Sequence, residues 1–373
     1  MSKVIYIFFV FLVAQNDCSG NRYTDYIFDV ATDYQVLYGQ NTNQTISGSE
    51  YTQNLYMDIY YPAEDSLDDR PLIFFLFGGS FVEGSKSSNL VVSLCNKYAQ
   101  MGYVAVAIDY RLSQHLLFTN PTELNGYIAV MKATHDLKAA IRYFRMNDEL
   151  FNDYNIDSNR IFVGGYSAGA FTSINSAYLN EQSEVPTFLI NYFNSNGGFE
   201  GLSGNPGYDS TINGVVNLSG AIGDSDWLVE NDIPIVSMHG DEDDVVPYAN
   251  DLVTLFGLNI EVDGSYIIHE KMQELGNYSA LYTYENEGHG PYSDMEFEAD
   301  YTSSFLYDIV CPEVTIGDVN QDESINILDT VMLVNFILQL STPSFQEIQA
   351  SDMNDDGFLN IVDVVVLVNL IIS

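Results

Sequence analysis

The stretch Ile161-Phe-Val-Gly-Gly-Tyr-Ser-Ala-Gly169 decides how the whole chain is interpreted. It begins with an apolar run typical of a buried strand, and the residues after it continue with helical periodicity. Gly165 and Gly169 flank Ser167, and glycines at this spacing let a strand turn sharply into a helix without a clash of Cβ atoms. We therefore predict a strained strand–turn–helix whose apex presents the Ser167 hydroxyl.

Strand-like and helical segments alternate on both sides of this turn, from Tyr51 to Cys311. This alternation predicts an α/β fold, a mostly parallel sheet covered by helices. The expected strands are the short apolar runs at 71–77, 104–109, 161–164, 214–218, 234–239 and 279–284. The expected helices are 89–100, 130–144 and 168–179. Segment 191–209 is rich in Gly and Asn, and we expect it to be an inserted loop or cap that shapes the substrate pocket.

The composition excludes several classes of partner. The 373 residues include 12 Lys and Arg against 52 Asp and Glu, a formal net charge of −40. Nucleic-acid binding and adhesion to anionic lipid both depend on clustered basic residues, so neither is expected. Hydrophobic residues make up 46% of the chain and charged residues only 17%, which indicates a globular protein rather than an acidic disordered one.

The N-terminus reads as an export signal over residues 1–19. Lys3 precedes an apolar run at 4–14, which is too short for the roughly 20 apolar residues that a membrane span requires. We expect a secreted protein with no membrane span in the mature chain. Export permits disulfides, and we predict one between Cys18 and Cys311, which flank the large domain. Cys95 lies in an apolar run and is expected to be a buried free thiol.

A serine nucleophile needs a histidine base and a carboxylate that orients this base. In folds with such a turn, the acid and then the histidine follow the serine in the chain. His289 lies in a glycine-rich loop directly after a strand and is the expected base, whereas His239 ends a strand and is expected to support the acid-bearing loop. The acid belongs to segment 241–244, where three aspartates compete and the motif alone does not choose between them.

Two segments carry a resemblance to secreted bacterial carboxylesterases of the α/β-hydrolase fold. Residues 239–248 resemble the HGxxDxxVPY loop of these enzymes, which implies that Asp243 is the acid. Residues 77–81 resemble their HGGGF or HGGSF oxyanion loop, which implies the amides of Gly79 and Ser80 as donors beside that of Ala168. Phe77 stands where the family has histidine, and this departure raises the question of what braces the loop. The resemblance covers about residues 22–311.

The last part of the chain contains a repeat. Residues 313–373 hold ten Asp and Glu and no Lys or Arg, and the segment 318–329 recurs at 352–363. Oxygen-bearing residues occupy positions 1, 3, 5, 9 and 12 of each segment, and position 7 offers its backbone carbonyl, as in a calcium-binding loop. The carboxylates repel one another without a cation, so calcium binding should contribute to folding. The predicted calcium ligands are Asp318, Asn320, Asp322, Ser324, Asn326 and Asp329 in the first loop, and Asp352, Asn354, Asp356, Phe358, Asn360 and Asp363 in the second.

An apolar helix is expected behind each loop, at 331–338 and 365–371, and the two should pack together because neither can bury its face alone. This duplicated loop and helix resembles a type I dockerin. The resemblance implies two calcium ions and a cohesin-like or surface-anchoring partner that binds through residues 313–373. Loop positions 10 and 11, where cellulosomal dockerins have small polar pairs, are here the apolar pairs Ile327-Leu328 and Ile361-Val362.

Taken together, these patterns predict an export signal (1–19), an α/β-hydrolase esterase domain (20–312) and a dockerin-like module (313–373). The expected activity is that of an exported serine carboxylic-ester hydrolase, which needs no cofactor for catalysis and acts on esters such as acetyl or feruloyl groups of polysaccharide. The alternatives are a serine peptidase, a polyester depolymerase, or a non-catalytic adhesion protein with a hydrolase-like fold. The predicted location is extracellular or at the cell surface.

Overall fold

The computed structural model describes Cys18, residues 21–312 and residues 314–372, apart from positions 323, 339, 342, 344 and 355–357. The predicted export signal lies outside these residues except for Cys18. Contacts between Cα atoms divide the chain into two compact units, Asn21–Leu306 and a second unit that includes Tyr307–Ser373. Among the described residues, no helix is both long and apolar enough to cross a membrane.

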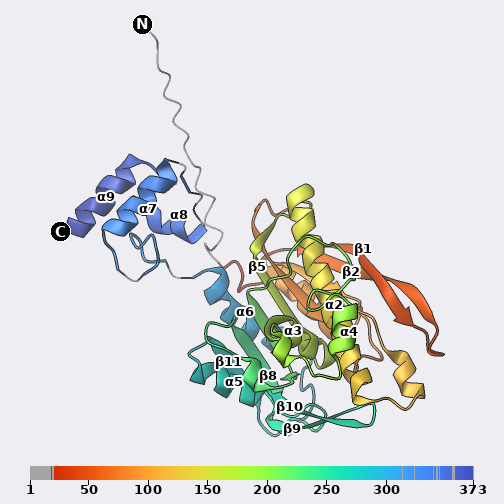
Figure 1. Cartoon of the computed structure of the whole chain (residues 1–373). Coiled ribbons are helices and arrows are strands. Elements are labelled where there is room, and N and C mark those ends of the chain that lie inside the picture. The colour runs from red at the N-terminus through yellow and green to blue at the C-terminus, as the bar shows by residue number, and fades with distance from the viewer. Residues whose placement is uncertain are drawn as a thin grey trace. The chain divides into compact units, whose positions relative to one another are not determined.

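A sheet with the strand order β1-β2-β4-β3-β5-β6-β8-β11 forms the centre of the unit Asn21–Leu306 (Figure 1). Its last six strands are parallel. They are β4 (Val104–Ile108), β3 (Arg70–Leu76), β5 (Ile156–Tyr166), β6 (Gly214–Leu218), β8 (Ile235–Gly240) and β11 (Ser279–Tyr284). Every residue of β3, β4, β6 and β8 is buried, which explains why these strands appear in the sequence as apolar runs. The predicted α/β fold is confirmed.

Five of the strands in the described residues were not predicted. The hairpin of β1 (Val30–Gln44) and β2 (Glu50–Pro62) is antiparallel and forms one edge of the large sheet. Both strands are partly exposed and mix polar with apolar residues, so they lack the apolar runs that mark buried strands. The short strands β7 (Ala221–Ile222), β9 (Asn250–Leu255) and β10 (Leu258–Gly264) form a separate antiparallel sheet.

Helices pack against the large sheet. Figure 1 shows α2 (Glu123–Leu150), α3 (Ala168–Tyr178) and α4 (Ile190–Ser195) on one side of it. Helix α1 (Asn89–Met101) pairs with α6 (Glu296–Val310), where the hydroxyls of Tyr98 and Thr302 lie 2.7 Å apart. Helix α5 (Ser265–Glu274) packs beside β11. Helix α2 begins seven residues earlier than predicted, because a capping box of Thr122 and Asn125 starts it.

The second unit contains α7 (Ile327–Ile337), α8 (Phe345–Ser351) and α9 (Ile361–Ile372). Helices α7 and α9 follow the two repeated loops and pack together, as the repeat predicted. Helix α8 has only 7 residues, too few for a periodic pattern to stand out. The buried core of this unit consists of Val319, Leu333, Phe336, Ala350, Leu359 and Leu367.

Candidate active site

The turn between β5 and α3 places Ser167 at the C-terminal edge of the parallel sheet. Its backbone has a φ of 54°, a left-handed conformation that non-glycine residues rarely adopt. A Cβ at Gly165 would lie 2.5 Å from the carbonyl carbon of Gly169, and one at Gly169 would lie 2.2 Å from the Leu76 carbonyl oxygen. Both positions therefore require glycine, and the close packing they allow maintains the strained turn.

The structure brings Ser167, His289 and Asp243 together from three separate loops. The Nε2 atom of His289 lies 3.0 Å from Ser167 Oγ, and its Nδ1 atom lies 2.7 Å from Asp243 Oδ2. Because a carboxylate only accepts hydrogen bonds, Nδ1 carries a proton, and Nε2 of the neutral ring is left to accept the serine hydroxyl. This arrangement is the geometry that a serine nucleophile and its base require.

Asp243 is the aspartate of segment 241–244 that joins this arrangement. Its side chain is buried, whereas Asp241 and Asp244 are exposed. Its Oδ1 atom accepts the amides of Val245 and Val246, both at 2.9 Å.

A second histidine contacts the same carboxylate, since His239 Nε2 lies 3.0 Å from Asp243 Oδ2. Burial by itself raises the pKa of Asp243, but hydrogen bonds from the two histidines outweigh burial and hold that pKa well below its usual range. Asp243 is therefore an anion at neutral pH.

The predicted oxyanion loop passes directly over the nucleophile. A Cβ at Gly78 would lie 3.1 Å from Ser167 Cβ, and Gly79 and Ser80 have φ values of 118° and 50°. Within residues 21–312, the amides of Gly79 and Ser80 donate no hydrogen bond. The amide of Ala168 opens α3, where the first amides have no partner in the helix.

Tyr110 supports this loop at Phe77, the position where the carboxylesterases that the sequence resembles have histidine. The ring of Phe77 stacks on that of Tyr110 with centroids 4.2 Å apart, and the Tyr110 hydroxyl donates to the Phe77 carbonyl at 2.8 Å. A Cβ at Gly84 would lie 2.4 Å from the Phe77 ring. The loop is therefore closely packed although the histidine is absent.

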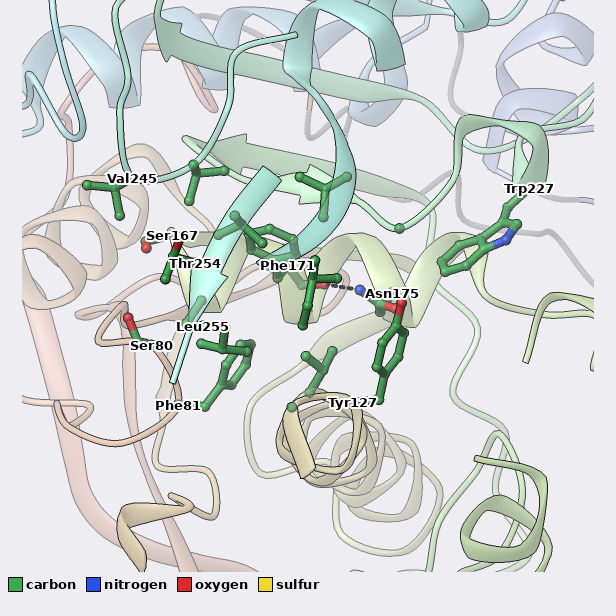
Figure 2. A pocket seen from close by; sticks show the side chains of 18 residues that line it. Ser80, Phe81, Tyr127, Ser167, Phe171, Asn175, Trp227, Val245, Thr254 and Leu255 are labelled. Carbon is green, nitrogen blue, oxygen red and sulfur yellow. Dashed lines mark hydrogen bonds between the residues drawn. The ribbon is translucent and has the colours of Figure 1, made fainter. Parts of the chain in front are cut away.

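A mostly apolar pocket opens beside Ser167 (Figure 2). One wall is the face of α3, and the hairpin of β9 and β10 forms another. The turn of this hairpin is Phe256-Gly257, both with positive φ, as in a type I′ turn. The lining side chains of the hairpin are Val253, Thr254, Leu255, Ile260 and Val262. Neither strand was predicted, because short strands with exposed polar residues give no clear pattern in the sequence.

The expectation that segment 191–209 shapes this pocket is wrong. None of its residues lines the pocket beside Ser167. The segment is instead tied to α2 by polar contacts, in which Arg142 pairs with the half-exposed Glu200 at 2.7 Å and Ser203 Oγ donates to Asp136 at 2.6 Å. Asp136 also pairs with Arg111, and the side chains of this second pair are buried.

The two repeated loops form matching sets of hydrogen bonds. Asp329 and Asp363, at position 12, are fully buried. Their Oδ2 atoms accept the amides of Asn326 and Asn360, at 2.7 and 2.9 Å. These two asparagines, at position 9, accept the amide two residues later through Oδ1 and thereby begin α7 and α9. The residues at positions 9 and 12 thus join each loop to the first turn of the helix that follows it by hydrogen bonds.

The other predicted ligands of the first loop lie close to one another. Asp318 Oδ1 accepts the Asp322 amide at 3.1 Å, and Asn320 Nδ2 donates to Asp322 Oδ2 at 2.9 Å. Ser324 donates its amide to Asp322 Oδ1 at 3.0 Å and offers its carbonyl to Asn326.

In the second loop, Asp352 is 8% exposed, and the Phe358 carbonyl accepts Asn360 Nδ2 at 2.9 Å. Of the predicted ligands at positions 3 and 5 of this loop, Asn354 is among the described residues and Asp356 lies outside them. The described residues contain no group of three His, Cys, Asp or Glu side chains arranged to hold a metal ion. The donor set nevertheless fits calcium, which also takes amide and carbonyl oxygens.

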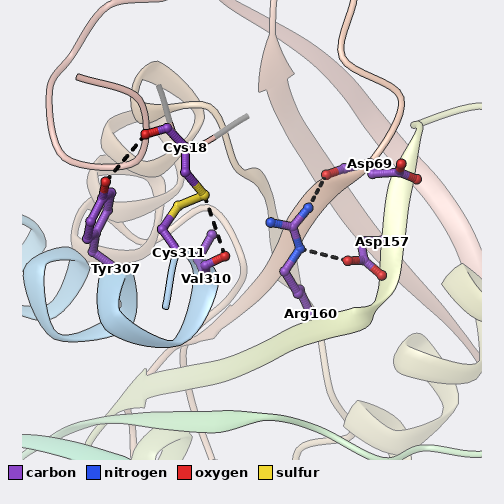
Figure 3. The surroundings of a disulfide bond; sticks show 7 residues. All are labelled: Cys18, Asp69, Asp157, Arg160, Tyr307, Val310 and Cys311. Carbon is purple, nitrogen blue, oxygen red and sulfur yellow. Dashed lines mark hydrogen bonds and ion pairs between the residues drawn. A yellow bond between two sulfur atoms is a disulfide. The ribbon is translucent and has the colours of Figure 1, made fainter. Parts of the chain in front are cut away.

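Cys18 and Cys311 form a disulfide with a Cα separation of 5.7 Å (Figure 3). The Tyr307 hydroxyl donates to the Cys18 carbonyl beside it. Cys95 is a buried free thiol, and burial raises its pKa. It is therefore protonated and unreactive at neutral pH.

Both parts of the chain match known protein families. Residues 57–223 match the family BD-FAE, and residues 316–372 match the type I dockerin domain. Gut esterase 1 of Caenorhabditis elegans is 31% identical over 101 residues, which are 27% of this chain and 17% of that relative. The chain thus spans only a small part of that curated relative.

Among solved structures, the fold resembles esterase 2 of Thermogutta terrifontis. Its apo form gives a TM-score of 0.52 at 19% identity, over 76% of this chain and 94% of that one. Its propionate-bound form gives 0.50 at 20% identity, over 74% and 97%. At such identities the similarity concerns the fold. The chain therefore contains an α/β-hydrolase domain of the BD-FAE type followed by a type I dockerin domain.

Proposed function

We propose that the α/β-hydrolase domain is a serine esterase that cleaves carboxylic esters. The observation that carries this proposal is the continuous relay from Ser167 Oγ through His289 to the buried carboxylate of Asp243. The match to BD-FAE and the similarity to Gut esterase 1 support an ester substrate over a peptide.

The relay supplies each proton transfer that ester hydrolysis needs. His289 Nε2 takes the hydroxyl proton as Ser167 Oγ bonds to the ester carbonyl carbon. The imidazolium is stabilised by Asp243 and returns this proton to the alcohol oxygen as the C–O bond breaks, which leaves an acyl-serine. A water molecule then gives a proton to His289 Nε2 and bonds to the acyl carbon. The bond from this carbon to Ser167 Oγ breaks, His289 returns the proton to Oγ, and the carboxylic acid leaves.

The negative oxygen of each tetrahedral intermediate is stabilised by amides. Gly79, Ser80 and Ala168 offer amides without other acceptors beside the nucleophile. Loss of one such donor typically costs about 2.7–4 kcal/mol of transition-state stabilisation. The rigid packing of Phe77 on Tyr110 fixes the first two donors before substrate arrives.

Hydrolysis of p-nitrophenyl acetate by the full chain and by Ser167→Ala tests the proposal. We expect the wild type to turn over and the variant to lose at least about a thousandfold in kcat/KM. Equal rates for the two proteins would reject the serine mechanism. A panel of acetyl and feruloyl esters, peptides and polyesters then separates the remaining classes of substrate.

We further propose that the dockerin domain binds two calcium ions and attaches the enzyme to a cohesin-like or surface-anchoring partner after export. Dockerin domains bind cohesins, and in this chain the side chains at positions 10 and 11 of both loops are exposed and apolar. They are Ile327, Leu328, Ile361 and Val362. Such a surface favours a partner with an apolar face. Polysaccharide esters are then the expected substrates, because docking would hold the enzyme near extracellular polymer.

A further inference from the structure

A polar pocket lies between the hairpin of β1 and β2 and loop 77–84, which carries the proposed oxyanion donors. Phe77 and Gly84, at the two ends of this loop, line the polar pocket. Ser80 and Phe81, in its middle, line the pocket beside Ser167 instead. One short loop thus borders both pockets, which places the polar pocket near the nucleophile.

The lining of the polar pocket favours a neutral ligand with hydroxyl groups. Five of its side chains are amides, those of Asn43, Gln44, Gln53, Asn54 and Gln114. Among the described residues, no Lys, Arg or His lines it, so an anion would find no cationic partner there. A side-chain amide both donates and accepts hydrogen bonds, as a hydroxyl does, and the two groups therefore match.

Hydrogen bonds fix the Gln53 amide so that its nitrogen is left to donate. Asn43 Nδ2 donates to the Leu112 carbonyl at 3.0 Å, and Lys132 Nζ donates to Asn43 Oδ1 at 3.2 Å. Since a carbonyl only accepts and an ammonium only donates, these contacts determine which side of the Asn43 amide is nitrogen. The same nitrogen lies 2.7 Å from Gln53 Oε1, so this oxygen accepts. Gln53 Nε2 has no acceptor within residues 21–312.

Asp109 presents an acceptor to the same pocket. Its Oδ1 atom accepts the amide of Lys86 at 2.9 Å, and no group within residues 21–312 donates to its Oδ2 atom. The ammonium of Lys86 is held elsewhere, because both carboxylate oxygens of Asp58 lie 2.8 Å from it. Asp109 is partly buried, and burial raises its pKa. A donor from a ligand would therefore stabilise its carboxylate.

Tyr51 adds an aromatic ring to the pocket, and the size of the pocket limits the ligand. The side chain of Tyr51 is 43% exposed, and its hydroxyl lies 3.1 Å from Gln53 Oε1. A sugar ring has apolar C–H faces as well as hydroxyls, and such a face can pack on an aromatic ring. The pocket volume is about 270 Å³, below the range of about 300–1,000 Å³ for drug-sized ligands. This volume suits one sugar ring.

From these groups we infer that the polar pocket binds one residue of a neutral saccharide. One sugar hydroxyl accepts from Gln53 Nε2, another donates to Asp109 Oδ2, and a ring face packs on Tyr51. A polysaccharide held in this way would have a raised effective concentration at Ser167. This use of the site rests on the proposed esterase function, whereas the binding of the sugar does not.

Saturation-transfer difference NMR on the full chain tests the binding with three unesterified sugars, xylotetraose, cellotetraose and mannotetraose. We expect at least one of them to bind. Gln53→Met removes the free donor and Tyr51→Ala removes the ring, and each variant should raise the Kd of that sugar about tenfold, which corresponds to about 1.4 kcal/mol. Thr52→Val, exposed on the same strand and outside the pocket lining, should leave the Kd unchanged.

Two controls show that the variants fold. All three should keep the thermal unfolding temperature of the wild type, measured by circular dichroism, to within a few degrees. They should also keep its kcat/KM on p-nitrophenyl acetate to within about twofold, because this ester carries no sugar. On an acetyl ester of the sugar that binds best, Gln53→Met should raise KM and leave kcat little changed.

The outcomes distinguish this inference from the proposed function. Absence of p-nitrophenyl acetate hydrolysis by the wild type would reject the esterase proposal and leave the sugar titrations to decide on the polar pocket. Binding of none of the three sugars would reject the saccharide site. A Kd that neither Gln53→Met nor Tyr51→Ala changes would reject it as well, since the sugar would then bind elsewhere.

Discussion

His239 is a second histidine, besides His289, that contacts Oδ2 of Asp243, the proposed catalytic acid. Its Nε2 atom faces two acceptors, Asp243 Oδ2 and the Val246 carbonyl, both at 3.0 Å, so this nitrogen carries a proton. Its Nδ1 atom lies 2.7 Å from the Ser265 hydroxyl, whose oxygen already accepts Asn217 Nδ2. The Ser265 hydroxyl also donates to the Gly220 carbonyl at 3.3 Å. These contacts hold the ring of His239 in place, and His239 thereby positions Asp243.

Replacement of His239 by leucine should impair the chemical step rather than substrate binding. Asp243 would lose one of its donors, and a hydrogen bond to a charged group is worth about 1.5–3 kcal/mol. We expect kcat to fall by about ten- to a hundredfold with KM little changed, as steady-state kinetics on p-nitrophenyl acetate can measure. His239→Gln keeps an N–H donor and should recover part of the loss. An equal loss in both variants would argue against the positioning role.

Single residues differ in how far sequence could identify them. Ser167 and His289 stand in motifs whose context predicts their roles, and the structure brings them into contact. Asp243 could not be chosen from the motif alone, because burial distinguishes it from its neighbours and burial depends on the folded loop. The pocket-lining residues of β9 and β10 gave no signal at all, since their place beside Ser167 depends on how this hairpin packs in the folded domain.

At the scale of elements, the packing of α2 against segment 191–209 should make the fold sensitive to acid. His135 on α2 is 1% exposed, and its Nε2 lies 2.8 Å from the Gly198 carbonyl. Burial lowers the pKa of His135 from 6.5 to about 4. Between these values only the unfolded chain binds the proton, so stability decreases as pH falls from 6.5 to 4.

The expected loss over that pH range is about 3 kcal/mol from this residue, at 1.36 kcal/mol for each unit of pKa. His135→Gln keeps a donor to the Gly198 carbonyl but does not titrate. Urea unfolding at pH 4.5 and pH 7 should therefore show a smaller pH dependence in the variant. An identical pH dependence in the two proteins would contradict this assignment.

The repeated loops predict that calcium stabilises helices α7 and α9, which follow directly after them. Asp329 and Asp363 are fully buried, and residues 313–373 contain no Lys or Arg to offset their negative charges. Calcium added to the full chain should raise the unfolding temperature of the dockerin domain in calorimetry, and a chelator should lower it. Asp352→Ala should weaken calcium binding, whereas Glu347→Gln, outside both loops, should not. No binding heat would contradict the loop assignment.

Elements with a strong apolar pattern were predicted well. The six parallel strands, four of which are buried throughout, were expected, and so were the helices after the two loops. Burial on both faces gives a strand an apolar sequence, and the repeat marks the two helices. Partly exposed strands such as β1, β2, β9 and β10 leave no such trace. The pocket wall was consequently assigned to segment 191–209 instead of the hairpin.

At the scale of the whole molecule, the disulfide should contribute to stability. It joins residues 293 positions apart, and a crosslink over a long loop restricts the unfolded chain and stabilises the fold by about 2–4 kcal/mol. Urea unfolding should show such a loss for Cys18→Ser relative to the oxidised wild type. A reducing agent should destabilise the wild type and leave Cys18→Ser unaffected. An equal response of both proteins to the reducing agent would contradict the role of this bond.

The formal net charge of −40 is another property of the whole molecule. Eleven of the twelve Lys and Arg residues lie between Lys3 and Arg160, and many of them are used in buried pairs such as Lys86 with Asp58. The exposed surface is therefore strongly acidic, which favours solubility and discourages association with other acidic molecules.

The bond between Cys18 and Cys311 also changes what a protease can achieve. The two cysteines enclose the whole chain segment that contains Ser167, Asp243 and His289. One cut of the backbone anywhere between them leaves both fragments joined through sulfur. A chain nicked once in this segment would thus keep Ser167, Asp243 and His289 covalently attached to the dockerin domain, and only a second cut or reduction of the disulfide could release part of it.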